Sequence, residues 1–464
     1  MTTNTTAIII GSNLAGRVCA RALSPLCERV ILIDRDELPG DDGARAGVPQ
    51  ARHAHMILDR GRRELEHYFP GYERRMLERG ARLVNPGMDY AVRGPVGWAR
   101  RVTTDARMMA GSRDLTDATI RELSPPLANV ELRARTEVKD LRLDGRRIAG
   151  VTVQSRETGA SEQLRADLVV DATGRSSKLP ALLEQAGVKP PTETVIDSGM
   201  WYFTRWFQAR PGHGQVESRW WSAAVVAPSL AGPGAMLVPI ENDRWIVSIG
   251  SVGPTQPKVD ESNFMAVLQG LSSPVIAETV SDALTPVWGF RGTSNRMRNF
   301  ASWADPVAGL VAIGDAACAL NPLHGHGVTC AVMSVRTLEA AITDDGIRSP
   351  TLATRYHKTH ARWLRGPWGA ATGFDLMFPT TEGKRPLAPK LMAPYMKLFA
   401  AGVREDPELH RHIIDVMQLN RPAGSLMEPP VVARVLALAV KRRFKGKPAA
   451  TSPIAAYPPG AITA

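Results

Sequence analysis

The chain has 464 residues, a length that predicts two or three domains rather than one. Its composition is globular, with 44% hydrophobic and 22% charged residues, and no apolar run approaches the length of a membrane span. The net charge of +11 comes mostly from scattered arginines, without basic helices or interleaved aromatic residues, which argues against nucleic acid as the partner and favours an anionic ligand.

The four cysteines, Cys19, Cys27, Cys318 and Cys330, lie in or beside apolar segments and show no C-x-x-C spacing. We therefore expect buried, reduced thiols and no metal site. The residues before the first apolar run contain no basic region, and that run is too short for a signal peptide. The expected location is the cytoplasm, without stable insertion into a membrane.

The first predicted unit spans residues 7–36. An apolar stretch at 7–10 runs into a glycine-containing turn at 11–16, a helical pattern follows, and a second apolar stretch at 30–33 ends at Asp34. Parallel strands that are buried on both faces have such continuous isoleucine and valine runs. The order of strand, turn, helix and strand predicts the opening of a fold that binds a dinucleotide.

The residue types in this turn have physical reasons. Gly11 allows a sharp turn, and Gly16 allows the helix to pack closely on the sheet. The helix N-terminus offers backbone N–H groups and a partial positive charge to a pyrophosphate, while Asp34 lies where an acid accepts ribose hydroxyls. Asn13 replaces the usual middle glycine. Because Asn tolerates positive φ, we expect the turn to persist, with the phosphate held slightly further away.

Two polar features follow. Residues 47–55, with an arginine and two histidines, precede a helical pattern from Met56 to Phe69 and indicate either a polar site or an ordinary loop. The two histidines are two residues apart, which is a poor spacing for a shared metal on a helix. Arg113 follows a predicted helix cap at Ser112, where it could bind phosphate or cofactor oxygens or form a surface salt bridge.

Strands are predicted over much of 130–171. Alternation indicates a strand at 130–138, then a hairpin over 138–154 with its turn at 144–145. A buried strand at 168–171 runs into a turn of small residues.

Residues 185–305 differ from the rest because strand-like, aromatic runs recur in them. These runs predict a mostly antiparallel sheet with one aromatic face. Packing in a core is the default for any single aromatic residue, but we expect some of the group to line an apolar pocket. The candidates for this substrate pocket are Trp201, Tyr202, Arg205, Trp220, Trp221 and Trp245.

Another buried strand, at 310–313, ends in Gly314-Asp315. Asp315 is placed to accept sugar hydroxyls from the other end of the same dinucleotide. The turn at 325–327 presents backbone N–H groups at the start of a helix that extends to about Ile342, which suits an anionic ring edge.

Beyond Thr351 the pattern is helical and punctuated by proline. Residues 431–441 predict an amphipathic helix with a basic end, for which packing on the protein surface is favoured over membrane contact. The tail from Lys447 is rich in proline and alanine and is expected to be disordered.

Three motifs carry a family resemblance: Gly11-x-Asn13-x-x-Gly16 with Asp34, the Asp-Ala-Thr-Gly-Arg turn at 171–175, and Gly-Asp-Ala-Ala at 314–317 followed by Pro322-x-x-Gly325-His326-Gly327. In this order they resemble the FAD-dependent monooxygenases of the p-hydroxybenzoate-hydroxylase type, the class A flavoprotein monooxygenases. Residues 47–55, Tyr202-x-x-Arg205 and Pro239-Ile240-x-x-x-Arg244-Trp245 are more closely similar to the flavin epoxidases of polyether antibiotic biosynthesis. The resemblance covers most of 7–440.

The resemblance implies an α/β fold: a Rossmann-like FAD-binding domain of the GR2 type, an inserted and mostly antiparallel β-sheet substrate domain, and a C-terminal helical region. The expected boundaries are 1–184 and 301–345 for the two parts of the FAD-binding domain, with an inserted segment at about 81–110, then 185–300 for the substrate domain, 346–446 for the helical region and 447–464 for the tail.

Carried over by position, the resemblance implies a set of FAD contacts. They are Gly11, Asn13, Leu14, Ala15, Gly16, Asp34, Arg35, Val48, Pro49, Gln50, Arg113, Val138, Gly174, Asp315, Pro322, Gly325, His326, Gly327 and Val328. Epoxidation requires no dedicated acid or base, so no residue is assigned a catalytic role. Gln50, Arg52 and His55 are candidates for positions close to the flavin ring.

The implied reaction transfers one oxygen atom from O2, through a flavin C4a-hydroperoxide, to an apolar, polyene-like alkene in secondary metabolism. NADPH or NADH would supply electrons directly or through a partner flavin reductase. One alternative is aromatic hydroxylation on the same scaffold. Another is an O2-independent reductase of isoprenoid double bonds, and a non-enzymatic flavoprotein partner is a third. The W-x-W-x-I-P motif associated with flavin halogenases is absent from the sequence.

Overall fold

The computed structural model describes residues 4–37, 49–94, 97–124, 126–209, 221–229, 232–253, 259–291, 293–386, 388–444 and Pro458. The α-helices in these residues are α1 (Leu14–Leu23), α2 (Asp59–Tyr68), α3 (Tyr72–Glu78), α4 (Arg113–Glu122), α5 (Leu179–Gln185), α6 (Phe264–Gln269), α7 (Val275–Thr279), α8 (His326–Asp345), α9 (Leu352–Asp375), α10 (Ala388–Val403), α11 (Pro407–Met417) and α12 (Pro429–Phe444). The expected disordered tail lies, except for Pro458, outside the described residues.

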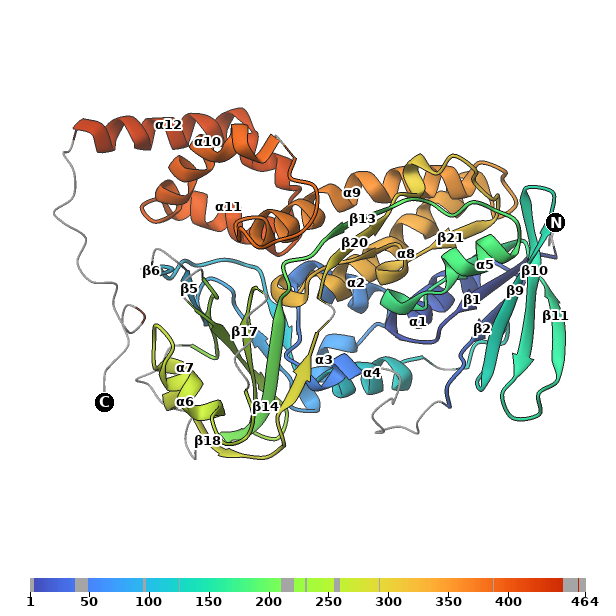
Figure 1. Ribbon diagram of the computed structural model, residues 1–464, viewed down its shortest axis with the longest axis horizontal. Coiled ribbons are helices and arrows are strands. Elements are labelled where there is room, and N and C mark those ends of the chain that lie inside the picture. Colours follow the sequence, from blue (N-terminus) through green and yellow to red (C-terminus); the bar gives the residue numbers. More distant parts are fainter. Residues whose placement is uncertain are drawn as a thin grey trace.

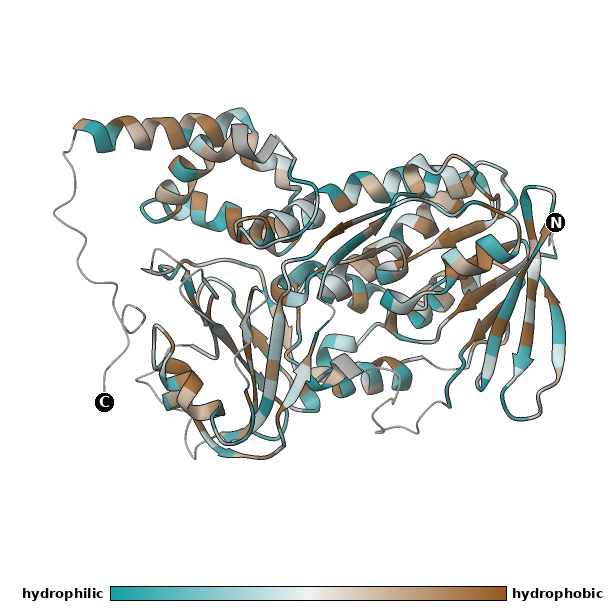
Figure 2. Ribbon diagram, in the orientation of Figure 1, coloured by the Kyte–Doolittle hydropathy of each residue, from teal (hydrophilic) through white to brown (hydrophobic). Residues whose placement is uncertain are grey.

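The first domain is built on a five-stranded parallel sheet (Figure 1). Its strands, in spatial order, are β21 (Leu310–Ala312), β12 (Leu168–Asp171), β1 (Thr6–Ile10), β2 (Arg29–Ile33) and β8 (Val130–Arg133). The apolar runs predicted as buried strands are confirmed, and Figure 2 shows hydrophobic residues along them. Alternate residues of each strand enter different cores, because side chains on a strand point to opposite faces.

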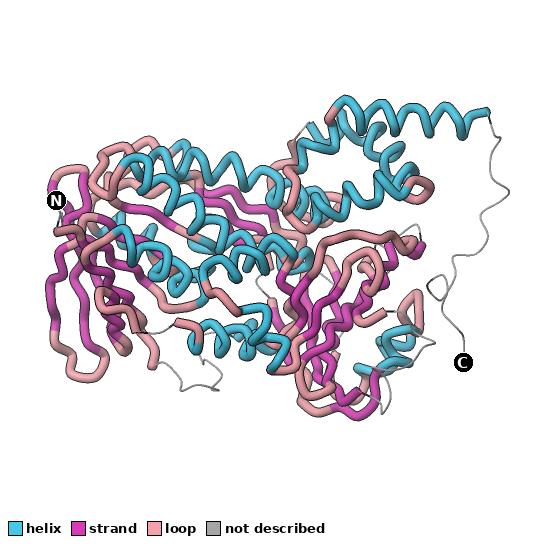
Figure 3. Tube along the Cα trace, turned by 180° about the vertical axis from the view of Figure 1, so that it is seen from behind, coloured by secondary structure: helices cyan, strands magenta, loops and turns pink. Residues whose placement is uncertain are grey.

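One face of this sheet is covered by helices. Ile9, on β1, belongs to a hydrophobic core that it shares with residues of α1, α2 and α8, and Figure 3 shows this helical layer from behind. Ile8 points to the other face, whose core includes α5 and the β9–β10 hairpin. That hairpin belongs to a three-stranded sheet of β11 (Ser161–Arg165), β10 (Arg147–Ser155) and β9 (Thr136–Asp144). Both faces of the parallel sheet are therefore buried.

The second domain is an eight-stranded, mostly antiparallel sheet. The main path is β18 (Val280–Ala283), β14 (Trp201–Ala209), β17 (Arg244–Ser251), β16 (Gly234–Ile240), β15 (Ala223–Val226), β5 (Tyr90–Gly94) and β6 (Gly97–Trp98), and β19 (Trp288–Phe290) also pairs with β14. The segment 81–110 contributes β5 and β6 to this sheet. Two short sheets connect the domains: β3 (Met56–Ile57), β7 (Met108–Ala110) and β4 (Arg82–Val84), and β13 (Glu193–Ile196), β20 (Asn295–Arg298) and β22 (Cys318–Ala319).

The two faces of the eight-stranded sheet have different neighbours. One face packs against α6 and α7 in a hydrophobic core. We call the opposite face the inner face; it presents Tyr202, Thr204, Trp206, Ser248 and Met236, as strand alternation requires. Met236 packs against a cluster that includes residues of β3 and β7, so the inner face is turned toward the first domain.

The C-terminal region is helical, as predicted. α9 packs on α8 and β21, and α10, α11 and α12 form their own hydrophobic cluster beyond it (Figure 1). In the described part of the chain, no helix has the length and apolarity needed to cross a membrane. The α/β fold with an inserted antiparallel sheet and a C-terminal helical region is thus the observed architecture.

Two observed elements have different bounds from the predicted ones. The strand predicted over 130–138 is divided at Arg135, where φ is 51°. The division arises because β8 pairs with β2 in parallel, whereas β9 joins an antiparallel sheet and must leave in another direction. The helix predicted from Met56 begins at Asp59, because Met56 and Ile57 pair with β7 instead. Neither tertiary pairing leaves a local signal in the sequence.

Candidate functional site

The turn between β1 and α1 requires both of its glycines. Gly11 has φ of +101°, and a Cβ added there would lie 2.9 Å from the Ala172 carbonyl oxygen. At Gly16 an added Cβ would lie 1.8 Å from the Gly11 carbonyl oxygen. Leu14 and Ala15 form the buried first turn of α1, where backbone N–H groups lack intrahelical acceptors. This helix start can bind an anion.

Asn13 stabilises the turn in a different way from the one expected. Its φ is −68°, so the explanation from positive φ is wrong. Asn13 caps α1, because its Oδ1 accepts a hydrogen bond from the Gly16 N–H at 3.3 Å. Its Nδ2 donates to the Ala172 carbonyl at 2.6 Å. The side chain therefore joins the first turn to the turn that follows β12.

Asn13→Ala is expected to destabilise the protein by about 1–2 kcal/mol, because it removes the helix cap and the bond to Ala172. Asn13→Ser retains a capping oxygen, so it is expected to lose about half as much. Thermal unfolding of the two variants measures the difference. Equal stability of Asn13→Ala and the wild type would contradict the structural role of this side chain.

The predicted ribose acid, Asp34, lies at the end of β2 with 8% of its surface exposed. Its carboxylate accepts hydrogen bonds from the backbone N–H groups of Ser12 (2.8 Å) and Asp36 (3.0 Å), which orient it at the turn. Arg35 beside it is exposed. The Asp34 carbonyl accepts from the N–H of Thr136, two residues before Val138 on the edge strand β9. Asp34, Arg35 and Val138 thus belong to one neighbourhood suited to an adenosine.

The turn after β12 is held by a local network. Asp171 accepts hydrogen bonds from the N–H and hydroxyl of Thr173, and its other oxygen accepts from Ser177. Gly174 has φ of +78° and open space where a side chain would be. Arg175 donates to the carbonyls of Ser294 (2.6 Å) and Leu320 (2.7 Å), which links this turn to two other segments. The sequence motif included Arg175, but it did not indicate this linking role.

The turn after β21 contains the carboxylate of Asp315, which lies near three arginines. Burial raises the pKa of Asp315, while the nearby positive charges of Arg175, Arg113 and Arg296 act in the opposite direction. Within the described residues no hydrogen-bond donor reaches its carboxylate. Asp315 is partly exposed, so its carboxylate can accept hydrogen bonds from a ligand that supplies hydroxyl groups, as predicted for the sugar-like chain of the cofactor.

The loop before α8 leaves an open helix start. Pro322 begins a short 3-10 helix, Pro322–His324, and Gly325, with φ of +66°, ends it and caps α8. An added Cβ at Gly327 would meet no atom within 4 Å. The first-turn N–H groups of α8, including those of Gly327 and Val328, lack intrahelical acceptors and can bind an anionic ring edge. His326, in contrast, is buried.

A buried polar network supports this loop from beneath. Asn321 donates to Asp375 Oδ1 at 2.9 Å, and Asn295 donates to Oδ2 at 2.6 Å. The Asn321 backbone N–H also donates to Asn295 Oδ1 at 2.7 Å. Burial raises the pKa of Asp375, whereas hydrogen bonds from Asn321, Asn295 and Ser198 lower it. Asn321 and Asp375 are 54 residues apart, so no sequence motif predicted the network.

The sequence left a cofactor contact or a surface salt bridge open for Arg113. It does form an ion pair, with Asp117 at 2.9 Å, but each side chain is only 13% exposed. Ser112 caps α4 as predicted, accepting from the Leu115 N–H at 3.0 Å. The Arg113 charge lowers the pKa values of Asp315 and His55, which places it between the loop at 49–55 and the turn after β21. It is therefore well placed for a cofactor contact.

The loop at 49–55 faces the second domain. Pro49 and Gln50 lie in a short 3-10 helix, Pro49–Arg52, and Val48 lies outside the described residues. Arg52 is exposed and lies over the ring of Trp288 at 5.3 Å, and its carbonyl accepts from Trp206 on the inner face.

His53 belongs to the polar segment that the sequence indicated, although not to the candidates for positions close to the flavin ring, and it contacts the inner face. His53 Nδ1 is 2.8 Å from Thr204 Oγ1, which is 2.6 Å from Ser248 Oγ. Its ring meets that of Tyr202 edge-on at 4.6 Å. His55 Nδ1 contacts the His53 carbonyl at 2.9 Å. The described residues contain no group of three or more metal-ligating side chains, and the two histidines make separate contacts.

The substrate-pocket candidates are divided between the two faces of the eight-stranded sheet. Tyr202 lies on the inner face, where it stacks on Phe290. Trp201, Trp221 and Trp245 lie in the core on the other face, packed with residues of α6 and α7. Arg205 shares that face by alternation and donates to the Thr285 carbonyl. Trp220 lies outside the described residues. This placement favours a structural role for the three tryptophans.

Buried histidines make stability depend on pH. Burial lowers the pKa values of His53 and His55 to about 4 and that of His326 to about 3. In the unfolded chain these groups titrate near about 6.5. Between about pH 4 and pH 6.5 the unfolded chain binds more protons, so the stability that neutral histidines contribute is complete above this window and is lost as the pH falls.

We therefore expect Tm to fall by several degrees between about pH 7 and pH 5. Differential scanning calorimetry of the protein measures this change. A Tm that is constant over this window would show that the histidines are already charged or exposed in the folded state.

The three turns lie together because they follow the carboxyl ends of the adjacent parallel strands β1, β12 and β21. The first turn would hold a pyrophosphate at the start of α1, and Asp34 would hold a ribose. Asp315 would hold the hydroxylated chain, and the start of α8 would hold the ring edge. The residues therefore fit FAD.

Comparison with known proteins agrees with this fit. The model of the family described as "FAD binding domain" matches residues 4–362. The chain is 26% identical over 449 residues to Protein Rv3254 of Mycobacterium tuberculosis (strain ATCC 25618 / H37Rv), with 93% of each chain covered.

Two solved structures share the fold. The flavin-dependent brominase Bmp2 has a TM-score of 0.66 at 16% identity, covering 96% of this chain and 100% of that one. The p-nitrophenol 4-monooxygenase PnpA from Pseudomonas putida DLL-E4 has a TM-score of 0.64 at 18% identity, covering 90% of this chain and 99% of that one. These likenesses extend over both domains and the helical region, and they show the fold alone.

Proposed function

The chain belongs to the FAD binding domain family, and from this premise we propose that it is an FAD-dependent monooxygenase that epoxidises an apolar alkene. A polyene-like product of secondary metabolism is the substrate class that we propose, on the basis of the epoxidase resemblance at 47–55 and 202–205. The proposal rests mainly on the electrostatics of the inner face.

The histidines of the loop at 49–55 and Tyr202 on the inner face are uncharged at neutral pH. Burial lowers the pKa values of His53 and His55 to about 4 and raises that of Tyr202. A histidine with so low a pKa is a weak general base at neutral pH. Hydroxylation of a phenol usually requires a base or a proton relay, whereas oxygen transfer to an alkene requires neither. This observation favours epoxidation over aromatic hydroxylation.

The chain's own residues would bind, orient and exclude water. When bound and reduced by NADPH or NADH, FAD supplies the activation of O2, with one oxygen atom going to the substrate and the other to water. Asp315 and the start of α8 would fix the position of the ring. Tyr202 and Phe290 would give the substrate an apolar surface at the inner face. A partner flavin reductase is the alternative route for the electrons.

Turnover under 18O2 tests this function. The FAD-loaded protein is incubated with NADPH or NADH, with and without a flavin reductase, and with a panel of polyenes and phenols. We expect epoxides that carry one labelled oxygen atom, and no product without O2. Mass spectrometry of the products measures the label.

The other reactions give different results in the same experiment. Labelled hydroxylation of phenols, without reaction of polyenes, would support the aromatic hydroxylase. Saturated products formed without O2 would support the reductase of isoprenoid double bonds. Either result would overturn the epoxidase proposal.

A further inference from the structure

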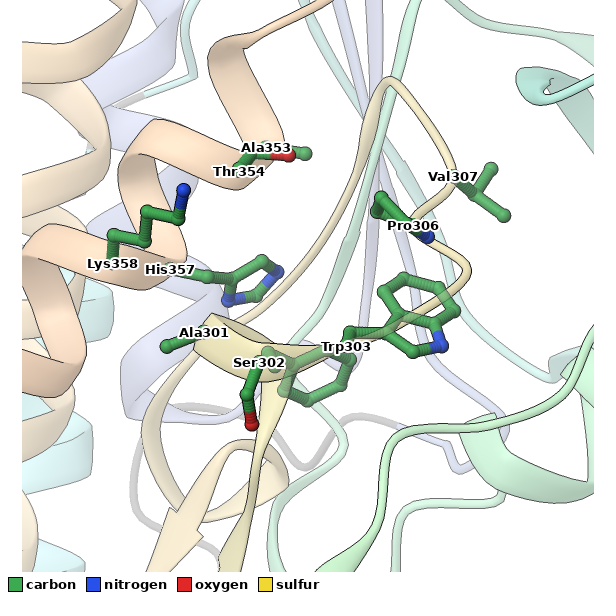
Figure 4. Close-up of a pocket in the computed structure, with 10 residues that line it drawn as sticks. Ala301, Ser302, Trp303, Pro306, Val307, Ala353, Thr354, His357 and Lys358 are labelled. Carbon is green, nitrogen blue, oxygen red and sulfur yellow. The ribbon is translucent and has the colours of Figure 1, made fainter.

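A second candidate site lies away from the three turns. A cavity of about 230 Å³ separates α9 from the segment 300–307 (Figure 4). It is lined by Phe300, Ala301, Ser302, Trp303, Pro306, Val307, Ala353, Thr354, His357 and Lys358. None of these residues belongs to the motifs of the FAD site.

The position of the cavity separates it from the flavin. Strand β21 lies at the edge of the parallel sheet, and Gly314 follows its carboxyl end. Val307 precedes its amino end and lines the cavity. Because the cofactor turns follow the carboxyl ends of the strands, the cavity lies toward the other end of β21.

The cavity has a buried aromatic floor and a polar mouth. The His357 ring stacks on Phe300 with centroids 4.4 Å apart and an angle of 9° between the planes, and Phe300 meets Trp303 edge-on. The Trp303 indole N–H is already used, since it donates to the Lys189 carbonyl at 2.7 Å. Ser302, Pro306 and Lys358 are exposed at the mouth.

His357 provides an unused acceptor at the floor. His357 is 4% exposed, and its Nε2 has no hydrogen-bond partner among the described residues. The backbone of Leu310 raises the pKa of His357, as a carbonyl that accepts from the ring does, and we assign this N–H to Nδ1 because Nε2 has no partner. Burial lowers the pKa of His357 to about 3, so the ring is neutral at neutral pH. When Nδ1 of a neutral ring carries the proton and donates, Nε2 is a hydrogen-bond acceptor. Other buried atoms of the described residues also lack a partner, but among them His357 Nε2 belongs to a residue that lines this cavity, so a donor group of a bound molecule can pair with it.

We propose that this cavity binds a small hydroxylated aromatic acid. Its hydroxyl group donates to His357 Nε2, its ring lies against the apolar lining, and its carboxylate lies beside Lys358 at the mouth. A cavity of about 150 Å³ with apolar walls holds a benzene molecule, so this volume accommodates one ring with substituents. Lys358 is the only charged residue of the lining, and the described residues give it no ion-pair partner.

Nitrogen NMR of the wild-type, FAD-loaded protein tests the contact directly. The probe is 3-hydroxybenzoate, and 3-methoxybenzoate serves as a matched compound without the donor. We expect 3-hydroxybenzoate to shift the His357 Nε2 resonance upfield and to bind with a dissociation constant of about 1 mM or below. The methyl ether is expected to bind about tenfold more weakly, with no such shift.

Two variants separate the cavity from other sites. His357→Phe keeps the stack on Phe300 but removes the acceptor, and we expect about tenfold weaker binding by calorimetry. His360→Phe is the control, because His360 is also buried with an unpaired Nε2 but does not line the cavity. Its binding should equal that of the wild type.

An unchanged His357 resonance at saturating 3-hydroxybenzoate would overturn the proposal, as would wild-type affinity of His357→Phe. A crystal structure of the soaked protein with only water in the cavity would also overturn it. Binding at the flavin is recognised by a change in the visible flavin spectrum. Binding in the cavity can therefore be measured without any assumption about the oxygenation reaction that we propose.

Discussion

Gly16→Ala is expected to lower the affinity for FAD by about a hundredfold or more. The added methyl group would lie 1.8 Å from the Gly11 carbonyl oxygen, which is backbone and has no rotamer by which to move away. Overpacking of this kind costs about 3 kcal/mol, and relief of the clash must move α1 away from the turn that would hold the pyrophosphate. The flavin content of the purified variant, from its visible absorbance, measures the loss.

Gly369→Ala is the matched control. Gly369 also lies within a helix, but an added Cβ there meets no atom within 4 Å. We expect full flavin content and a gain in stability of up to about 1 kcal/mol, because alanine has the higher helix propensity. Full flavin content in Gly16→Ala as well would show that the close approach of α1 to the sheet is not required for binding.

Asp375→Ala is expected to lower the free energy of unfolding by about 3–5 kcal/mol. Both Asp375 oxygens accept hydrogen bonds from buried amide groups of Asn321 and Asn295, and alanine would leave these donors unpaired. Each unpaired buried donor costs about 1–3 kcal/mol, and the loss of the acidic side chain leaves a cavity. Because Asn321 begins the loop before α8, we also expect weaker FAD binding. Urea unfolding and flavin fluorescence measure the two effects.

Asp282→Ala provides the comparison for removal of a carboxylate. Asp282 is exposed on β18, so its substitution is expected to change stability by less than about 0.5 kcal/mol. If Asp375→Ala were as stable as Asp282→Ala, the network beneath the loop would contribute no net stability, and its hydrogen bonds would only replace those to water.

The FAD site shows how far local patterns can predict structure. Gly11, Gly16 and Asp34 occupy the positions that the turn and strand pattern predicted, because their roles depend on backbone conformation within a single unit of strand, turn and helix. The cap that Asn13 forms with Gly16 is local, but its second partner, the Ala172 carbonyl, is 159 residues away. A contact at that separation has no local signal.

The aromatic residues of the second domain show what local patterns cannot predict. The recurrence of aromatic strands predicted a sheet, and that sheet is present. Which face receives helices and which faces the first domain depends on α6, α7 and the loop at 49–55, and these come from distant parts of the chain. The candidates Trp201 and Tyr202 are neighbours in sequence, yet they lie on opposite faces.

The sequence by itself determined the strand-to-helix turns, because they depend on residue types at short spacing, and the resemblance of its three motifs to a known family implied the fold class and the kind of cofactor. Only the tertiary structure decided the rest: the bond from Asn13 to the Ala172 carbonyl, the pairing of Asp375 with Asn321 and Asn295, the contact of His53 with the inner face, and the cavity beside His357. The physical reason is that hydrogen-bond satisfaction and burial are properties of neighbours in space, and the chain brings those neighbours together from positions far apart in the sequence.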